Sequence, residues 1–187
     1  MSAIDPSVRG RTVYYFSALA HHAEKNHPGV VARHEKYITA LESTGVQAEL
    51  GRFKEKDASC PRFRQTGPPC TFPSGVHCDG TFKRHEEKQT DVAIACRLLE
   101  LATTDKDCAS AVIVGGDSDL VPAIKTAKRL RPDMTVIALF PYRRRSNEVS
   151  QVVDRVLTVR PDRYERFQFP AVVVSARGVK ISKPQSW

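Results

Sequence analysis

The sequence lacks any apolar run long enough to cross a membrane, and no signal peptide opens it. We therefore expect a soluble, cytoplasmic protein with no membrane partner. It contains no internal repeat and no low-complexity tract. Five cysteines are an odd number, and nothing in their placement suggests a secreted disulfide framework. The 187 residues, of which 41% are hydrophobic and 27% charged, suffice for one α/β domain with a real core and an appendage.

Charge is not balanced along this chain. There are 29 basic and 21 acidic residues, which gives a formal net charge of +8. A basic excess favours a polyanionic partner, with nucleic acid first. A basic protein that binds no nucleic acid is the alternative that charge alone leaves open.

Strands and helices are expected to alternate. β-branched and apolar runs predict strands at residues 11–19, 46–53, 111–114, 134–140 and 155–159. Helical spacing of apolar residues predicts helices at residues 28–43, 90–102, 120–130 and 147–153, with Thr90 as an N-cap. Cys96 is expected to be a small core residue in the second helix. The alternation indicates an α/β fold with a mainly parallel sheet and helices on both faces.

Two segments depart from this alternation. Residues 54–84 contain four of the 12 prolines, three cysteines and no periodicity, so we expect a long loop or a small inserted subdomain. Residues 172–181 predict a hairpin around Ala176, Arg177 and Gly178. We therefore expect a domain over residues 1–160 with a Cys/Pro-rich insertion at about 54–84. A hairpin tail over 161–187 would pack on that domain.

The segment from Ala109 to Leu130 is the most informative part of the chain. The apolar run 111–114 is typical of a strand buried on both faces, and Gly115 and Gly116 end it. Asp117 and Asp119 follow at once, and apolar residues then recur at helical spacing. Such a strand, turn and helix places two carboxylates at the carboxyl edge of a parallel sheet, where open α/β folds bind their ligands.

A third carboxylate, Asp91, lies at the start of the preceding helix, which we expect His85–Lys88 to open. Three carboxylates at one place suit Mg²⁺ or Mn²⁺, which prefer oxygen ligands. Acids at a helix N-terminus also occur as caps or dipole partners, an alternative that explains Asp91 or Asp119 alone but not Asp117 as well. Glu87 is a weaker candidate, better explained as a solvated acid. Ser118 could contact phosphate or cap the next helix.

The sequence 88–92, Lys-Gln-Thr-Asp-Val, together with 112–120, Val-Ile-Val-Gly-Gly-Asp-Ser-Asp-Leu, resembles the NYN domain. This family is a branch of the PIN-like nuclease superfamily, and its bacterial LabA-like group is the most similar. Tyr14–Ala18, Tyr37–Leu41, Gly51–Phe53 and Lys183–Trp187 also fit members of the group, so the resemblance covers nearly the whole chain.

The resemblance implies a PIN-like three-layer fold and metal-dependent RNA cleavage. Asp91, Asp117 and Asp119 map onto the acidic cluster of the family, with Asp117 as the central ligand. The ion would activate water for in-line attack on phosphorus and offset charge on the leaving oxygen. An RNA-binding or regulatory module with an eroded catalytic set is the alternative. A receiver- or phosphatase-like domain with an Asp nucleophile is a third.

The chain departs from the family at its beginning. Family members start with a strand that carries an Asp, often within Asp-Gly-x-Asn, whereas nothing like it precedes Tyr14. We therefore expect the first strand and one metal ligand to be missing from this sequence. Met1 is then a late start, the chain is a shortened natural variant, or a second copy or another partner completes the sheet.

Cys60, Cys70 and Cys78, with His77 and His85, offer ligands for a structural Zn²⁺ site that would order the insertion. Their spacing is not that of the usual close pairs, and unconnected thiols in a loop are the alternative.

Arginines follow the fourth strand at the same edge as the acids. Arg143, Arg144 and Arg145 are expected to contact the phosphates of RNA, and Tyr142 either stacks on a base or packs on the surface. The basic residues on and after the helix at 120–130 are better explained as a solvated face; they are Lys125, Lys128, Arg129 and Arg131.

Overall fold

A computed structural model describes residues 12–66, 70–71, 77–175 and 177–185. The α-helices are α1 (Val30–Glu42), α2 (Pro61–Thr66), α3 (Thr90–Thr104), α4 (Val121–Leu130), α5 (Asn147–Val152) and α6 (Pro161–Arg166). Two 3₁₀ turns are η1 (His21–Ala23) and η2 (Ser118–Leu120). The strands are β1 (Val13–Ser17), β2 (Val46–Leu50), β3 (Arg52–Ser59), β4 (Cys70–Thr71), β5 (His77–Cys78), β6 (Thr81–Lys88), β7 (Ser110–Val114), β8 (Thr135–Phe140), β9 (Arg155–Thr158), β10 (Val172–Val174) and β11 (Lys180–Ser182).

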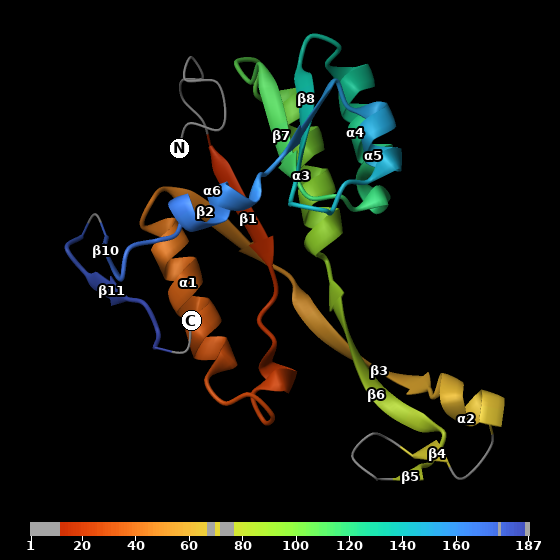
Figure 1. The fold of residues 1–187 in the computed structure, drawn as a ribbon. Helices are drawn as coiled ribbons and strands as arrows, with labels where there is room; N and C mark the ends of the chain where they lie inside the picture. Colours follow the sequence, from red (N-terminus) through yellow and green to blue (C-terminus); the bar gives the residue numbers. More distant parts are fainter. Residues whose placement is uncertain (1–11, 67–69, 72–76, 176, 186–187) are drawn as a thin grey trace.

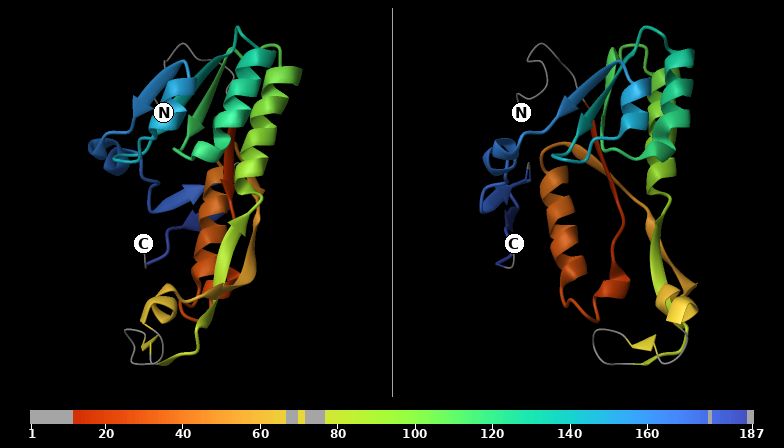
Figure 2. Two further views of the ribbon diagram at one scale, coloured as in Figure 1. Left: turned by 90° about the vertical axis from the view of Figure 1, so that its right-hand side faces the viewer. Right: turned by 45° about the vertical axis from the view of Figure 1, so that its right-hand side comes forward.

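The fold is mixed α/β with parallel sheets, as the alternation of strands and helices predicts (Figure 1). β1 pairs with β2 in parallel, and β7, β8 and β9 form a second parallel sheet in that order. Helix α1 lies on one side of β1, and α3 lies on the other (Figure 2). Helices therefore lie on both sides of β1. Within the described residues, no helix is long and apolar enough to cross a membrane.

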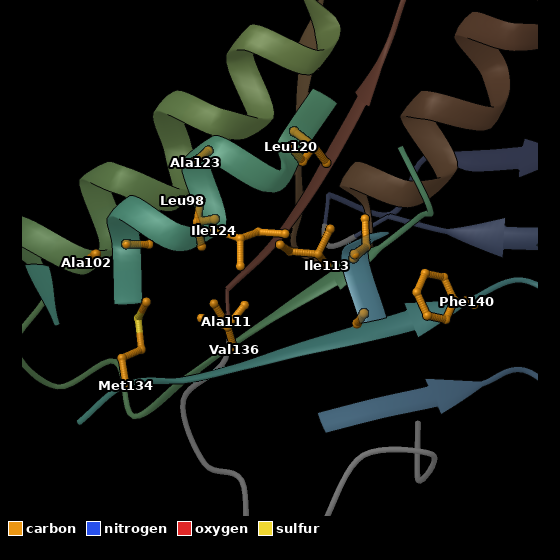
Figure 3. Close-up of a cluster of buried hydrophobic side chains, with 13 residues drawn as sticks. Leu98, Ala102, Ala111, Ile113, Leu120, Ala123, Ile124, Met134, Val136 and Phe140 are labelled. Atoms are coloured by element: carbon orange, nitrogen blue, oxygen red, sulfur yellow. The ribbon is translucent and has the colours of Figure 1, made fainter. Parts of the chain in front are cut away.

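The main core lies between the second sheet and helices α3, α4 and α5. Leu120, Ala123, Ile124 and Ala127 are all buried, which confirms the predicted apolar stripe of α4. Figure 3 shows this stripe above Ala111, Ile113 and Val136 of the sheet. Burial of this stripe holds α4 against β7, and so fixes the turn between them where the two aspartates lie.

The structure corrects two expectations about burial. Val114 is 67% exposed, so β7 buries Ala111 and Ile113 on one face but is not covered on both. Cys96 is exposed and is not a core residue, because the buried face of α3 carries Leu98 and Ala102 instead.

The two parallel sheets are separate. Among the described residues, β1 has only β2 as a strand neighbour, and β7 has only β8. Helix α3 contacts both β1 and β2, and its Arg97 forms an ion pair with Glu49 of β2 while its guanidinium lies 4.6 Å from the ring centroid of Tyr14 in β1. Helix α3 therefore connects the first sheet to the main core.

Of the two alternatives for residues 54–84, a long loop and a small inserted subdomain, the irregular loop is wrong, because the segment contains β3, α2 and β6. β3 and β6 pair in antiparallel register over eight residues each, from Arg52 opposite Lys88 to Ser59 opposite Thr81. This hairpin extends away from the parallel sheets (Figure 1). The acidic segment His85–Lys88 therefore belongs to a strand and does not open α3, which begins at Thr90. The strand carries alternating charges in place of an alternating apolar pattern, so its sequence does not identify it as a strand. These charges pair across the hairpin, as Lys83 does with Glu55 and Asp57.

The C-terminal segment forms an antiparallel hairpin, β10 with β11, that contacts α1. Phe169 approaches Tyr37 of α1 edge-on, with the ring centroids 6.1 Å apart. Ala176, Ser186 and Trp187 lie outside the described residues.

Asp154, before β9, fixes the end of α5 to β8 and α4. Its carboxylate accepts hydrogen bonds from Lys128 Nζ at 2.6 Å and from the backbone N–H of Val136 at 2.8 Å, and these donors hold the pKa of Asp154 below its usual value.

We expect Asp154→Asn to lower the free energy of unfolding by about 1 kcal/mol at pH 7, after allowance for solvent screening. A lowered folded-state pKa means that this contribution is present above the unfolded-state pKa and is lost as pH falls through the folded-state value. Urea denaturation of both proteins at several pH values should therefore give curves that converge in acid. Asp107→Asn, at an exposed loop position, is the matched control; a difference independent of pH would contradict the assignment.

Candidate active site at the carboxyl edge

The turn after β7 holds Asp117 and Asp119. Asp117 is the N-cap of η2, and its side chain accepts a hydrogen bond from the backbone N–H of Asp119 at 2.9 Å. One oxygen of Asp117 therefore caps the turn, a role that the sequence pattern suggests for Asp91 or Asp119 and not for Asp117. Its other oxygen has no such role in the turn, and both aspartates are exposed. Ser118 lies between them as the first residue of η2.

Gly116 brings a second loop against this turn. A Cβ atom at Gly116 would lie 2.6 Å from the carbonyl oxygen of Arg144, which is closer than side-chain carbons approach backbone. Only glycine allows this approach without movement of the loop that follows β8. Arg143, Arg144 and Arg145 are consequently held beside the aspartates, and all three are exposed.

The start of α3 supplies Asp91, in the first turn of the helix. Thr90 is not the N-cap; Gln89 is, with a left-handed φ of 81°, and Thr90 Oγ1 instead donates to Glu87 Oε1 at 2.6 Å. This bond turns the carboxylate of Glu87 toward the helix start. Gly51 packs against the segment that leads into α3. A Cβ atom at Gly51 would lie 2.5 Å from the carbonyl oxygen of Lys88, so a larger residue would push the two segments apart.

The carboxylates lie close enough to interact. Partial burial raises the pKa of Asp91, and the negative charges of Asp117, Glu87 and Asp119 raise it further. The three carboxylates chosen from the sequence therefore share one electrostatic environment, and the structure adds Glu87 to them. Like charges held together in this way disfavour one another unless a cation or a proton joins them.

The donor set fits a hard divalent cation, because it consists of carboxylate oxygens with raised basicity at Asp91. Across the described ranges, however, no three His, Cys, Asp or Glu side chains already stand in a metal-binding arrangement. Binding of an ion would therefore require these exposed side chains to rotate toward a common centre.

The zinc prediction falls partly outside what the structure describes. Cys60 is buried. Cys70 and Cys78 lie opposite each other in the β4–β5 pair. The side chains of Cys70, Cys78 and His77 lie outside the described part of the structure. His85 is not part of such a site. It lies opposite Glu55, about 13 Å along the hairpin from Ser59 at β-strand rise, and it stacks on His22 with ring centroids 3.9 Å apart. Zinc binding by the three cysteines stays a prediction.

Comparison with known proteins identifies the family. The NYN domain model matches residues 9–160. The chain belongs to the NYN domain family. NYN domains are PIN-like nuclease domains that act on nucleic acid and generally use divalent metal ions. The match includes β1, the carboxylates and the Arg143–Arg145 loop, whereas the C-terminal hairpin lies beyond it.

A solved structure of a protein of unknown function from Vibrio parahaemolyticus is also similar to this NYN chain. The two sequences are 16% identical. The similar region covers 81% of this chain and 70% of the Vibrio chain, with a TM-score of 0.49. Comparison with curated proteins gave no match. The LabA-like subgroup stays a prediction.

Two features of this NYN chain escaped the sequence analysis. Glu87 was set aside because an acid near a helix start is usually solvated, and only the hydrogen bond from Thr90 shows its place beside Asp91. Helix α6 was not expected, although Pro161 followed by Asp162 is an ordinary signal for a helix start.

Proposed function

We propose that this NYN chain is a ribonuclease that hydrolyses RNA phosphodiester bonds with Mg²⁺ or Mn²⁺ held by Asp91, Asp117 and Asp119. The observation that carries the proposal is that Asp91, in the first turn of α3, lies near enough to the turn after β7 for the charges of Asp117 and Asp119 to act on it. Partial burial raises the pKa of Asp91 most, and the charges of Asp117, Glu87 and Asp119 raise it further. When bound, the ion supplies activation of water and neutralises charge that develops on the leaving oxygen.

The residues of the chain position the RNA in this proposal. The hydrogen bond from Asp119 N–H to one oxygen of Asp117 fixes the turn, and the other oxygen would bind the ion. Arg143, Arg144 and Arg145 would bind phosphates next to the scissile bond, and Ser118 could donate its hydroxyl to a phosphate oxygen. Together these contacts would hold the phosphodiester over the carboxylates.

The assay is incubation of the purified chain with end-labelled single-stranded RNA and Mn²⁺, Mg²⁺ or EDTA. Cleavage that requires the ion supports the proposal. Binding without cleavage by clean wild-type protein would support the second candidate, an RNA-binding or regulatory module. That candidate is favoured by the absence, in the described part of the chain, of a metal arrangement already formed.

Metal binding is testable without catalysis. Because neighbouring charges raise the pKa of Asp91, its ionised form destabilises the folded state above that pKa, and a divalent cation should relieve this. We expect Mn²⁺ at about ten times its Kd to raise Tm by about 3–6 °C at pH 7, and less as pH falls and Asp91 is protonated.

The control for this measurement is Asp107→Asn, before the opposite end of β7, which should keep the Mn²⁺ effect. Asp117→Asn should lose it and should itself raise Tm slightly in EDTA, since one of the like charges is gone. An equal Mn²⁺ shift in wild type and Asp117→Asn would place the ion elsewhere.

We also propose that another polypeptide, from a second copy or a partner, completes the sheet. Support comes from β1 and β7, which each have one strand neighbour among the described residues, and from the exposed Val114. Light scattering that gives a monomer mass would argue against a second copy.

A further inference from the structure

Three aromatic side chains are exposed near the carboxyl edge of β8 and β9, where a globular protein gains nothing from them. Tyr142 in the loop after β8 is 45% exposed, and Tyr164 and Phe167 at α6 are each 44% exposed. Tyr164 lies in α6, and Phe167 is the C-cap residue of that helix. These three rings are called the aromatic platform below.

Arginines lie against the faces of the platform. The guanidinium of Arg143 is 5.2 Å from the ring centroid of Tyr142, and those of Arg163 and Arg166 are 6.0 and 5.8 Å from the ring of Phe167. Arg143 has a φ of 58°, a left-handed conformation that costs a non-glycine residue about 1 kcal/mol or more. Asp162 partly offsets the positive charge around α6 through ion pairs with Arg160 and Arg163.

The platform is continuous with the carboxylate site. The backbone N–H of Tyr142 donates to the hydroxyl of Tyr164 at 2.9 Å, which joins the loop to α6. The same loop carries Arg144, whose carbonyl oxygen packs against Gly116, the residue before Asp117. α6 follows β9 directly, beside the end of the sheet (Figure 1). A chain of contacts therefore leads from the carboxylates to Phe167.

We propose that the aromatic platform binds the bases of single-stranded RNA whose backbone passes the carboxylate site. This inference rests on the proposed function and specifies its substrate as unpaired RNA. Bases of any identity stack on aromatic rings and on guanidinium planes packed over them, and the same guanidinium groups pair with the phosphates between the bases. In a duplex the faces of the bases are already stacked, so the platform discriminates against double-stranded RNA.

The experiment measures binding of fluorescently labelled single-stranded RNA, and of the same strand in a duplex, by anisotropy in EDTA. The test variant is the full-length chain with Tyr142→Leu and Phe167→Leu, which keeps apolar bulk but removes flat rings. Phe82→Leu is the matched control, since Phe82 is 39% exposed on the distant β3–β6 hairpin. Circular dichroism and Tm check that each variant folds.

We expect the double variant to bind single-stranded RNA about 10-fold or more weakly than wild type, and Phe82→Leu to bind like wild type. Wild type should bind the single strand more tightly than the duplex. Arg163→Ala with Arg166→Ala should reduce the slope of log K against log salt by about 0.7 per arginine, whereas Arg129→Ala on α4 should not.

The outcomes separate the two proposals. If wild type binds or cleaves RNA and the double variant binds RNA with the same affinity, the platform proposal is wrong and the proposed function stands. The rings would then serve a protein partner. Equal affinity for duplex and single strand would overturn the choice of substrate. A wild type that neither binds nor cleaves RNA would overturn the proposed function itself, and the platform with it.

Discussion

Replacement of Asp117 by asparagine is expected to lower the rate of metal-dependent RNA cleavage by about 100-fold or more, with RNA binding retained. Asparagine keeps an oxygen that can accept the hydrogen bond from Asp119 N–H, so the turn before α4 should stay in place. What it removes is one negative oxygen from the carboxylate cluster. Loss of groups that merely orient metal ligands costs 10- to 100-fold, so loss of a ligand should cost at least as much.

Two comparisons make this result specific. Asp117→Ala removes the N-cap as well, and should additionally lower the free energy of unfolding by about 1 kcal/mol. Asp107→Asn should cleave RNA like wild type. Single-turnover cleavage of labelled RNA in Mn²⁺ gives the rates, and anisotropy in EDTA gives the binding. Cleavage by Asp117→Asn at the wild-type rate would show that this cluster is not the active site.

Replacement of Phe140 by alanine is expected to lower the free energy of unfolding by about 3–5 kcal/mol, the largest stability effect that we expect in this chain. Phe140 is fully buried at the end of β8, in the core shared with α4 and α5. Its ring also lies 3.5 Å from the position that a Cβ of Gly116 would occupy. Truncation therefore leaves a cavity directly beneath the turn that carries Asp117.

Urea denaturation measures this effect, and Phe82→Ala is its control. Phe82 is exposed, so its truncation should change the free energy of unfolding by no more than about 0.5 kcal/mol. The loss of unfolding free energy in Phe140→Leu should lie between those of Phe140→Ala and Phe82→Ala, because leucine refills most of the space. A loss below about 1 kcal/mol in Phe140→Ala would mean that the core collapses around the cavity, and that the turn does not depend on the ring.

Local patterns in the sequence determined the elements of the parallel sheets. The spacing of Leu120, Ala123, Ile124 and Ala127 reports the buried face of α4 directly, because a helix of 3.6 residues per turn has one such stripe. Gly115 and Gly116 after an apolar strand likewise predict a turn followed by a helix, which the structure contains, whereas the capping role of Asp117 was not predicted. These are contacts between near neighbours in the chain, and residue types encode them.

Sequence patterns gave wrong predictions where residues distant in the sequence determine whether a segment pairs as a strand or a side chain is buried. β3 and β6 carry alternating opposite charges and little apolar surface, so no period identified them as strands. Cys96 was placed in the core by spacing, yet the face of α3 that is buried depends on where α4 packs. The apolar run 111–114 predicts a strand buried on both faces, whereas the exposure of Val114 shows that one face of β7 is not fully covered, which only the packing of distant elements determines.

By itself, the sequence determined that Asp91, Asp117 and Asp119 occupy a helix start and a turn at strand ends, since local geometry dictates both places. Only the tertiary structure decided that their charges act on one another and that Glu87 joins them. The same holds for the hydrogen bond that joins Tyr142 to Tyr164 and for the guanidinium groups over Tyr142 and Phe167. The reason is that electrostatic and stacking contacts depend on distances in space, which packing of the core sets and which residue order alone does not contain.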